Sequence, residues 1–203
     1  MGTLAEAAAR LKRAAGSDLP ALVLMTDDVR LADPLPAARA LPPGSAVILR
    51  HYRAPERASL ARSLAAIARR RGLILLVGED PALARRVGAH GVHLPEHAIG
   101  RAGAVRWHRD WLITAAAHSH AALRSAAAAG ADAVLLAPVF ATASHPDARA
   151  LGTHRFVALA RNCPIPTYAL GGIDRARAQH LHGTGAVGIA GIGGLIPQEA
   201  PRR

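Results

Sequence analysis

The sequence is poor in aromatic residues, in cysteine and in lysine. Aromatic side chains make up 3% of the 203 residues, so a core has to be built from the Ala, Leu, Val and Ile that dominate the 51% apolar fraction. Such residues suit parallel strands covered by helices. Cys163 is the only cysteine, which excludes an internal disulfide and a multi-cysteine metal site. Lys12 is the only lysine and precedes the first apolar run, which argues against a Schiff-base aldolase.

Long apolar segments are also missing. No run reaches the roughly 20 apolar residues of a membrane span, and residues 1–12 mix charges with alanines instead of forming the apolar core of a signal peptide. We therefore expect a cytoplasmic protein without a membrane partner. The net charge of +11 comes from arginines that are scattered along the chain without neighbouring aromatics. That pattern indicates a solvated surface and no nucleic-acid partner.

Short apolar runs alternate with segments of helical spacing through the whole sequence. The apolar runs are residues 21–25, 46–50, 73–77, 91–94, 112–115, 133–137, 167–170 and 186–190. The helical segments are residues 54–71, 82–87, 120–129, 156–160 and 175–182. The alternation predicts the α/β class.

Eight runs, with glycine signals after the last two, favour a single-domain (β/α)8 TIM barrel over residues 1–203. The tail, residues 197–203, is expected to fray. An open doubly wound sheet is the alternative, but the first run lacks the G-x-G-x-x-G that follows the first strand of a dinucleotide-binding sheet. The oligomeric state stays open, and a homo-oligomer is compatible with the sequence.

Two glycine-rich turns follow the seventh and eighth predicted strands. The expected phosphate-binding residues in these turns are Gly171, Gly172, Gly191, Ile192 and Gly193. Barrel ligands bind at the carboxyl ends of the strands, and bare glycines let backbone N–H groups approach a phosphate. The seventh-strand turn is expected to open a helix, whose N-terminus adds favourable partial charge. In the alternative reading, the glycines only satisfy tight turns.

Other polar residues follow the predicted strands. Thr142 and Ser144 bring two hydroxyls to the loop after the sixth strand, and His145 follows them, so this loop is expected to clamp a phosphate or to cover the barrel mouth, with a solvated loop as the alternative. Arg50 ends the second strand, where its fork of donors suits a phosphate or a carboxylate. Candidates for acid, base or metal duty are Glu79, Asp80, His93, Glu96, His97, His118 and His120. His118 and His120 are too close in sequence for a rigid zinc pair, and no third ligand stands out.

Several stretches carry a family resemblance. Residues 88–94 (GAHGVHL), 117–119 (AHS), 130–132 (GAD), 137–140 (APVF), 169–173 (ALGGI) and 185–190 (GAVGIA) resemble the thiamine phosphate synthase and thiazole tautomerase superfamily, in order and at predicted strand ends. The resemblance implies a barrel of thiamine biosynthesis. Its small-molecule partner would be a phosphorylated thiazole.

For a synthase, the resemblance implies that magnesium shields a pyrophosphate leaving group while a thiazole nitrogen captures a pyrimidine carbocation. Arg50 fits the arginine of the family's second-strand motif, but Ile48 and Tyr52 stand at its glutamine and lysine. Gly78 and Glu79 replace the third-strand Asn-Asp pair, which leaves Glu79 as a weak candidate for a magnesium ligand. Magnesium is therefore a cofactor with an eroded ligand pattern.

The erosion continues along the chain. The second magnesium aspartate has no counterpart unless Glu96 substitutes. Thr142 and Ser144 match the two hydroxyls of the sixth-loop motif, whereas His145 replaces its lysine, and Gly193 stands at a usual serine. Each lost contact is expected to raise the synthase barrier by about 2 to 4 kcal/mol.

The tautomerase branch, by resemblance, needs only a proton shuttle over a bound thiazole carboxylate phosphate. Its histidine at the sixth-strand end is replaced by Pro138, which leaves His118, His120 or His145 as the expected catalytic residue. The sequence thus predicts a tautomerase-like isomerase or a divergent synthase. A non-catalytic phosphate-ligand binding or regulatory protein is the alternative, and an unrelated phosphosugar or indole-type barrel ranks last.

Overall fold

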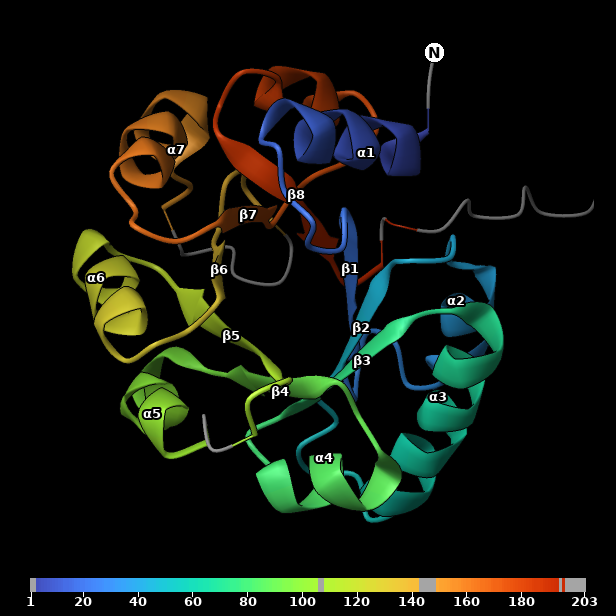
Figure 1. The fold of residues 1–203 in the computed structure, drawn as a ribbon. Coiled ribbons are helices and arrows are strands. Elements are labelled where there is room, and N and C mark those ends of the chain that lie inside the picture. Colours follow the sequence, from blue (N-terminus) through green and yellow to red (C-terminus); the bar gives the residue numbers. More distant parts are fainter. Residues whose placement is uncertain (1–2, 106–107, 143–148, 194, 196–203) are drawn as a thin grey trace, which may run out of the picture.

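The protein is a closed parallel barrel. The computed structural model describes residues 3–105, 108–142, 149–193 and 195. The strands found in these ranges are β1 (Leu22–Met25), β2 (Ala46–Leu49), β3 (Ile74–Gly78), β4 (Gly91–Leu94), β5 (Leu112–Ala117), β6 (Ala133–Leu136), β7 (Thr167–Leu170) and β8 (Ala186–Gly191). Each strand pairs in parallel with the next, and β8 pairs with β1, which closes the sheet (Figure 1). The TIM-barrel prediction is confirmed, and the open sheet is excluded.

Helices surround the barrel. They are α1 (Leu4–Ala14), α2 (Leu35–Ala40), α3 (Arg57–Arg71), α4 (Pro81–Val87), α5 (Ala102–Val105), α6 (His120–Ala128) and α7 (Gly152–Arg161), with 3-10 helices η1 (Glu96–Arg101) and η2 (Arg177–Leu181). The helix α1 precedes β1 in the chain but packs on β8, at the closure of the barrel (Figure 1). A capping box between Thr3 and Glu6 fixes its start.

The helix expected over residues 175–182 is wrong. This interval forms a turn and then the five-residue 3-10 helix η2. Gly172 and Gly183, both at positive φ, bracket the interval, and the Asp174 side chain holds the backbone N–H of Arg177 at 2.8 Å. The expected helix N-terminus at Gly172 is therefore absent, and this turn can bind an anion only through its own N–H groups and nearby side chains.

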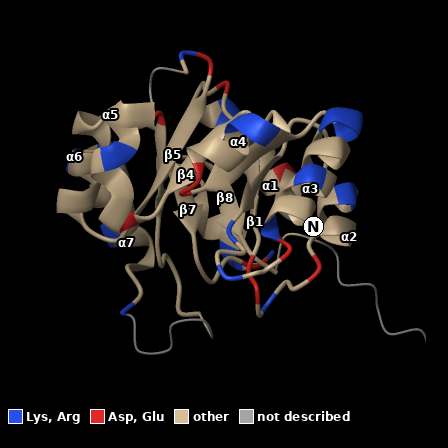
Figure 2. Ribbon diagram, turned by 90° about the horizontal axis from the view of Figure 1, so that it is seen from below, with Lys and Arg blue, Asp and Glu red and all other residues tan. Residues whose placement is uncertain are grey.

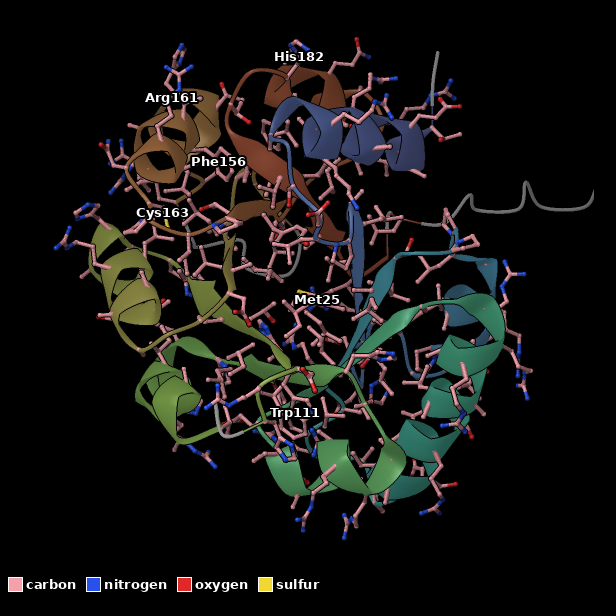
Figure 3. All side chains as sticks on the ribbon, in the orientation of Figure 1. Met25, Trp111, Phe156, Arg161, Cys163 and His182 are labelled. Carbon is pink, nitrogen blue, oxygen red and sulfur yellow. The ribbon has the colours of Figure 1, made fainter. Side chains whose placement is uncertain are left out.

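Side chains fill the barrel. Alternate strand positions point inward, and the interior cluster includes Met25, which lies at the centre of the view in Figure 3, with Ile48, Leu135 and Tyr168. The Tyr168 hydroxyl donates a 2.7 Å hydrogen bond to the Pro20 carbonyl, so the one phenol in this core is satisfied. The larger apolar cluster lies between strands and helices. The packed interior leaves the ligand-binding space at the mouth.

The surface is basic on many sides. Lys and Arg occur on several outer helices, including α3, α4 and α6 (Figure 2), and α3 carries five arginines. In the described ranges, no helix has both the length and the apolar character needed to span a membrane. Residues 197–203, the expected frayed tail, lie outside the described residues.

Candidate functional site

A pocket of about 1040 Å³ opens at the carboxyl ends of the strands. It brings together most of the residues singled out in the sequence: Arg50, His118, Thr142, Gly171, Gly172, Gly191, Ile192 and Gly193 all line it. His120 does not line it, because it is the first residue of α6. Ser144 and His145 lie outside the described residues. We call this space the mouth pocket.

The turn after β7 is held against the loop after β6. Gly171 and Gly172 have φ values of 98° and 64°, a region that side chains disfavour. A Cβ on Gly172 would lie 2.6 Å from the Ala141 carbonyl oxygen and 2.8 Å from that of Phe140. Both glycines are therefore needed for the chain path itself, whatever the turn binds.

The turn after β8 is built differently. A Cβ on Gly193 would meet no atom of the described residues within 4 Å, and the residue is exposed. A Cβ on Gly191 would approach only the flexible end of Leu195, at 3.1 Å. No packing reason demands glycine at position 193, so substitutions there can probe ligand binding without disturbing the fold.

Arg50 is positioned by a buried relay at the ends of β1 and β2. Its backbone N–H donates to the Thr26 hydroxyl at 2.9 Å, and Thr26 lies 2.8 Å from Nδ1 of the buried His51. The Nε2 of His51 lies 3.2 Å from the Ala32 carbonyl oxygen, so Nε2 carries the proton and Nδ1 accepts from Thr26. The relay fixes the chain direction that sends the Arg50 side chain into the mouth pocket.

Asp27 joins two arginines at the same rim. Its Oδ2 lies 2.6 Å from Arg30 Nη2 and 3.9 Å from Arg50 Nη2. The side-chain hydrogen bond from Arg30 holds the pKa of Asp27 well below its usual value. Arg30 and Arg50 both line the mouth pocket. Two cations and one carboxylate leave this rim with a net charge of +1. Arg30 was missed in the sequence because it reads as a loop arginine.

Two histidine–carboxylate pairs span the rim from β3 to β5. His97 Nε2 lies 3.0 Å from Glu79 Oε1, and His118 Nδ1 lies 2.7 Å from Glu96 Oε2. The same Glu96 oxygen accepts the backbone N–H of His118 at 2.9 Å. Glu96 and His97 belong to η1, which follows β4. This short helix therefore contacts the residues that follow β3 and β5, the two strands on either side of β4.

Magnesium does not fit these groups well. Among residues 3–105, 108–142, 149–193 and 195, no three His, Cys, Asp or Glu side chains gather closely enough to hold a metal ion. Magnesium prefers octahedral oxygen ligands, whereas Glu79 and Glu96 are each engaged by an imidazole. Glu79 therefore stands without the companion ligands that magnesium requires in this part of the chain.

His93 lies at the floor of the mouth pocket. Its Nδ1 is 2.9 Å from the hydroxyl of Thr114, its neighbour in register on β5, and only 2% of the residue is exposed. Burial, helped by the nearby charge of Arg50, lowers the pKa of His93 to about 3. The imidazole is therefore neutral at physiological pH and offers a ligand a polar contact without charge.

Arg177 is a second residue that sequence reasoning missed. It lines the mouth pocket beside the β7 turn, and its Nη1 donates to the Gly172 carbonyl at 2.9 Å. In the sequence it sits inside a segment with helical spacing, where an arginine reads as part of a solvated face. Its distance of five residues from Gly172 was the only available signal.

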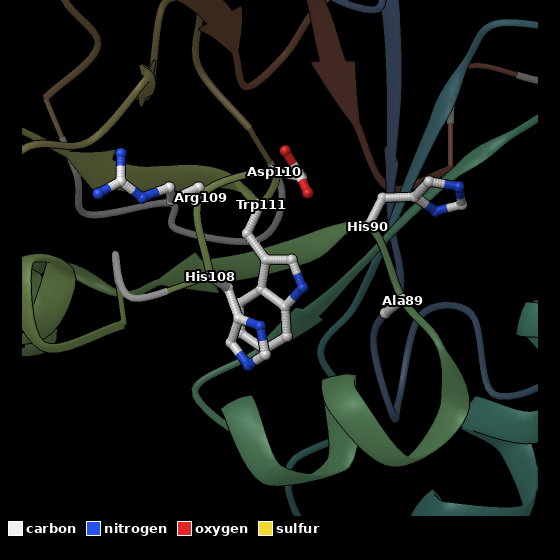
Figure 4. Close-up of a pocket in the computed structure, with 6 residues that line it drawn as sticks. All are labelled: Ala89, His90, His108, Arg109, Asp110 and Trp111. Atoms are coloured by element: carbon white, nitrogen blue, oxygen red, sulfur yellow. The ribbon is translucent and has the colours of Figure 1, made fainter.

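A second hollow lies away from this site. It measures about 570 Å³ and is lined by residues at the starts of β4 and β5, among them His90 and Arg109. His108 stacks on Trp111 there with ring centroids 3.9 Å apart (Figure 4). The amino ends of barrel strands serve stability in such folds, so we assign the chemistry to the mouth pocket.

Comparisons with known proteins show the family of the chain. Residues 22–195 match the family model described as "Thiamine monophosphate synthase". The chain is similar to the thiamine-phosphate synthase of Thioalkalivibrio sulfidiphilus, with 35% identity over 149 residues that cover 72% of this chain and 71% of the relative. It is also 34% identical over 137 residues to the synthase of Chloroflexus aurantiacus, covering 67% and 63% of the two chains.

A solved structure is similar over most of its length. It is the thiamine phosphate pyrophosphorylase of Pyrococcus furiosus, with a TM-score of 0.72 and 27% identity. The similarity covers 84% of each chain. Both the sequence and the fold therefore point to one family.

Proposed function

The chain belongs to the thiamine monophosphate synthase family of thiamine biosynthesis, and from this premise we propose that it is a tautomerase-like isomerase of a thiazole carboxylate phosphate. The observation that carries the proposal is the His118–Glu96 pair, which lies at the same mouth pocket as the glycine turns. A candidate base and a candidate phosphate site that line one pocket support the proposal. No metal is needed for such a proton transfer.

The proposed proton shuttle follows from the tautomer of His118. Because the carboxylate of Glu96 can only accept at neutral pH, Nδ1 of His118 carries the proton and Nε2 presents a lone pair. Nε2 takes a proton from one position of the bound thiazole and returns it at another, and Glu96 stabilises the imidazolium between the two steps. General acid–base catalysis of this kind contributes about 10²- to 10⁴-fold.

The two ends of the substrate are proposed to bind at different rims. The phosphate lies on the N–H groups of Gly171–Gly172 and Gly191–Gly193, with Thr142 beside them. The carboxylate faces Arg30 and Arg50. Because Asp27 reduces the net charge of that rim to +1, the rim suits a ligand with a single negative charge better than a pyrophosphate with several.

A divergent synthase is the competing function, favoured by the names of the similar proteins. Purified protein is incubated with thiazole phosphate, pyrimidine pyrophosphate and magnesium in one reaction, and with thiazole carboxylate phosphate in D2O in another. Exchange of deuterium into the thiazole supports the isomerase. Thiamine phosphate formed at a useful rate, without exchange, would overturn it, and tight binding with neither reaction would indicate a non-catalytic binder.

A further inference from the structure

The two glycine turns at the phosphate end of the mouth pocket, Gly171–Gly172 and Gly191–Gly193, carry no cationic side chain of their own. They supply N–H donors, and no α-helix begins at Gly172 to add a dipole. Arg30 and Arg50 come from the segments that follow β1 and β2, and Lys12 lies on α1, outside the pocket. Among the described residues lining the pocket, Arg177 is the cation that accompanies the turn after β7.

The guanidinium of Arg177 is fixed by two segments that also define the turn. Its Nη1 donates to the Gly172 carbonyl at 2.9 Å, and its Cζ lies 5.7 Å from the centroid of the Phe140 ring. Phe140 belongs to the loop that approaches Gly172 most closely. The guanidinium donors are thereby held beside the turn. Among the described residues, Nη2 of Arg177 makes no hydrogen bond or ion pair, so it can donate to a ligand.

Asp174 opposes the charge of Arg177. Its Oδ2 lies 3.7 Å from Arg177 Nε, and its Oδ1 accepts the backbone N–H of Arg177 at 2.8 Å. Asp174 also lines the mouth pocket. The pair is neutral overall, so an incoming anion gains the guanidinium contact but is repelled by the carboxylate. The affinity for an anion therefore depends on both the attraction by Arg177 and the repulsion by Asp174.

We infer that Arg177 is a phosphate-binding residue for a phosphomonoester, and that Asp174 limits the affinity it provides. The inference rests on the proposed function, because it takes the β7 turn as the phosphate end. The guanidinium binds a phosphate oxygen through Nη2 while Nη1 keeps its bond to Gly172. The ligand class is a small heterocycle bearing a phosphate ester, and the dephosphorylated alcohol gains nothing from Arg177.

Calorimetry with two ligands tests this assignment: thiazole phosphate and the corresponding thiazole alcohol. For Arg177→Gln, the Kd of the phosphate is expected to rise about 10- to 100-fold, with that of the alcohol unchanged. Arg177→Lys is expected to recover part of the loss, since it keeps the charge without the fork. Asp174→Asn keeps the acceptor for the Arg177 N–H and is expected to lower the Kd of the phosphate.

Arg175→Gln is the matched control, because Arg175 lies in the same loop but does not line the pocket. It removes the same charge and is expected to change the Kd less than about twofold. Equal losses of affinity for phosphate and alcohol in Arg177→Gln, or equal effects of Arg175→Gln and Arg177→Gln, would overturn the inference.

Deuterium exchange separates this inference from the isomerase proposal. If Arg177→Gln weakens phosphate binding selectively but the wild-type protein catalyses no exchange, the role of Arg177 stands and the isomerase proposal fails. If Arg177→Gln catalyses exchange with an unchanged KM, the isomerase proposal stands and the role of Arg177 fails.

Discussion

One oxygen of Glu96 accepts both the backbone N–H and the ring Nδ1 of His118, at 2.9 and 2.7 Å. The two residues are 22 positions apart and meet because η1 follows β4 while His118 follows β5. The double contact fixes the ring of an otherwise exposed histidine. A histidine oriented in this way is suited to proton transfer.

Removing the imidazole should abolish the proton shuttle. For His118→Gln we expect kcat for deuterium exchange to fall about 10²- to 10⁴-fold with little change in KM. Glu96→Gln should cause a smaller loss, because its amide can still accept from Nδ1 but no longer stabilises the imidazolium. His120→Gln serves as the control, since His120 does not line the pocket. Equal losses in His118→Gln and His120→Gln would remove His118 from the proposed mechanism.

Position 193 should report on phosphate binding without loss of stability. Gly193→Asp places a negative charge at the turn after β8, where a Cβ meets no atom of the part of the chain that the structure describes within 4 Å. We expect thiazole phosphate affinity to fall by at least about tenfold while the melting temperature stays the same. Gly193→Ser adds a donor and should keep or improve affinity. If Gly193→Asp bound the phosphate normally, this turn would not be part of the phosphate site.

A larger residue at Gly172 is expected to act differently. Gly172→Val forces a β-branched residue into positive φ and against two carbonyl oxygens, so it should lose about 2 kcal/mol or more of folding free energy. Urea unfolding measures this loss. Full stability of Gly172→Val would show that the chain path at Gly172 tolerates a side chain, contrary to the geometry.

Asp27 should determine which anions the β1–β2 rim accepts. Asp27→Asn keeps acceptors for the local backbone but raises the charge of the rim from +1 to +2. Binding of inorganic pyrophosphate, measured by calorimetry, is expected to strengthen about tenfold. Asp28→Asn makes the same change of charge without a contact to Arg50 and should have a smaller effect. Equal effects of the two variants would indicate general attraction instead of a defined site.

The buried His93 should make stability depend on pH. Its pKa is about 3 in the folded protein and near 6.5 when unfolded, so between these values the unfolded chain binds more protons. The free energy of unfolding should therefore fall as the pH drops from 6.5 toward 3, by up to about 1.4 kcal/mol per unit from this group. Urea unfolding at pH 7 and pH 5 should show a smaller decrease for His93→Gln. An unchanged decrease would contradict the assignment.

Much of the fold could be predicted because buried parallel strands read as short apolar runs. The runs at residues 91–94 and 167–170 match β4 and β7 at both ends. Residues 175–182 were predicted as a helix from their spacing, but they form a turn and the 3-10 helix η2. The 3-10 helix η1 was not predicted, since its six residues carry no complete helical pattern.

Some residues of the candidate site could be predicted from the sequence, and others could not. Gly171 and Gly172 stood out in the sequence because glycine pairs after a strand are distinctive. The pairing of Glu96 with His118 was not predicted, because it depends on the pairing of β4 with β5 and on the path of the unpredicted helix η1. Arg177 was missed for a related reason: its role depends on the turn and on Phe140, which lies 37 residues earlier in the sequence.

Deuterium exchange into thiazole carboxylate phosphate, followed by NMR with purified protein in D2O and EDTA, tests the central claim most directly. The isomerase account predicts exchange at a rate that does not depend on added magnesium and that His118→Gln reduces at least about 100-fold. No exchange by the wild-type protein, or exchange at the same rate in His118→Gln, would contradict it.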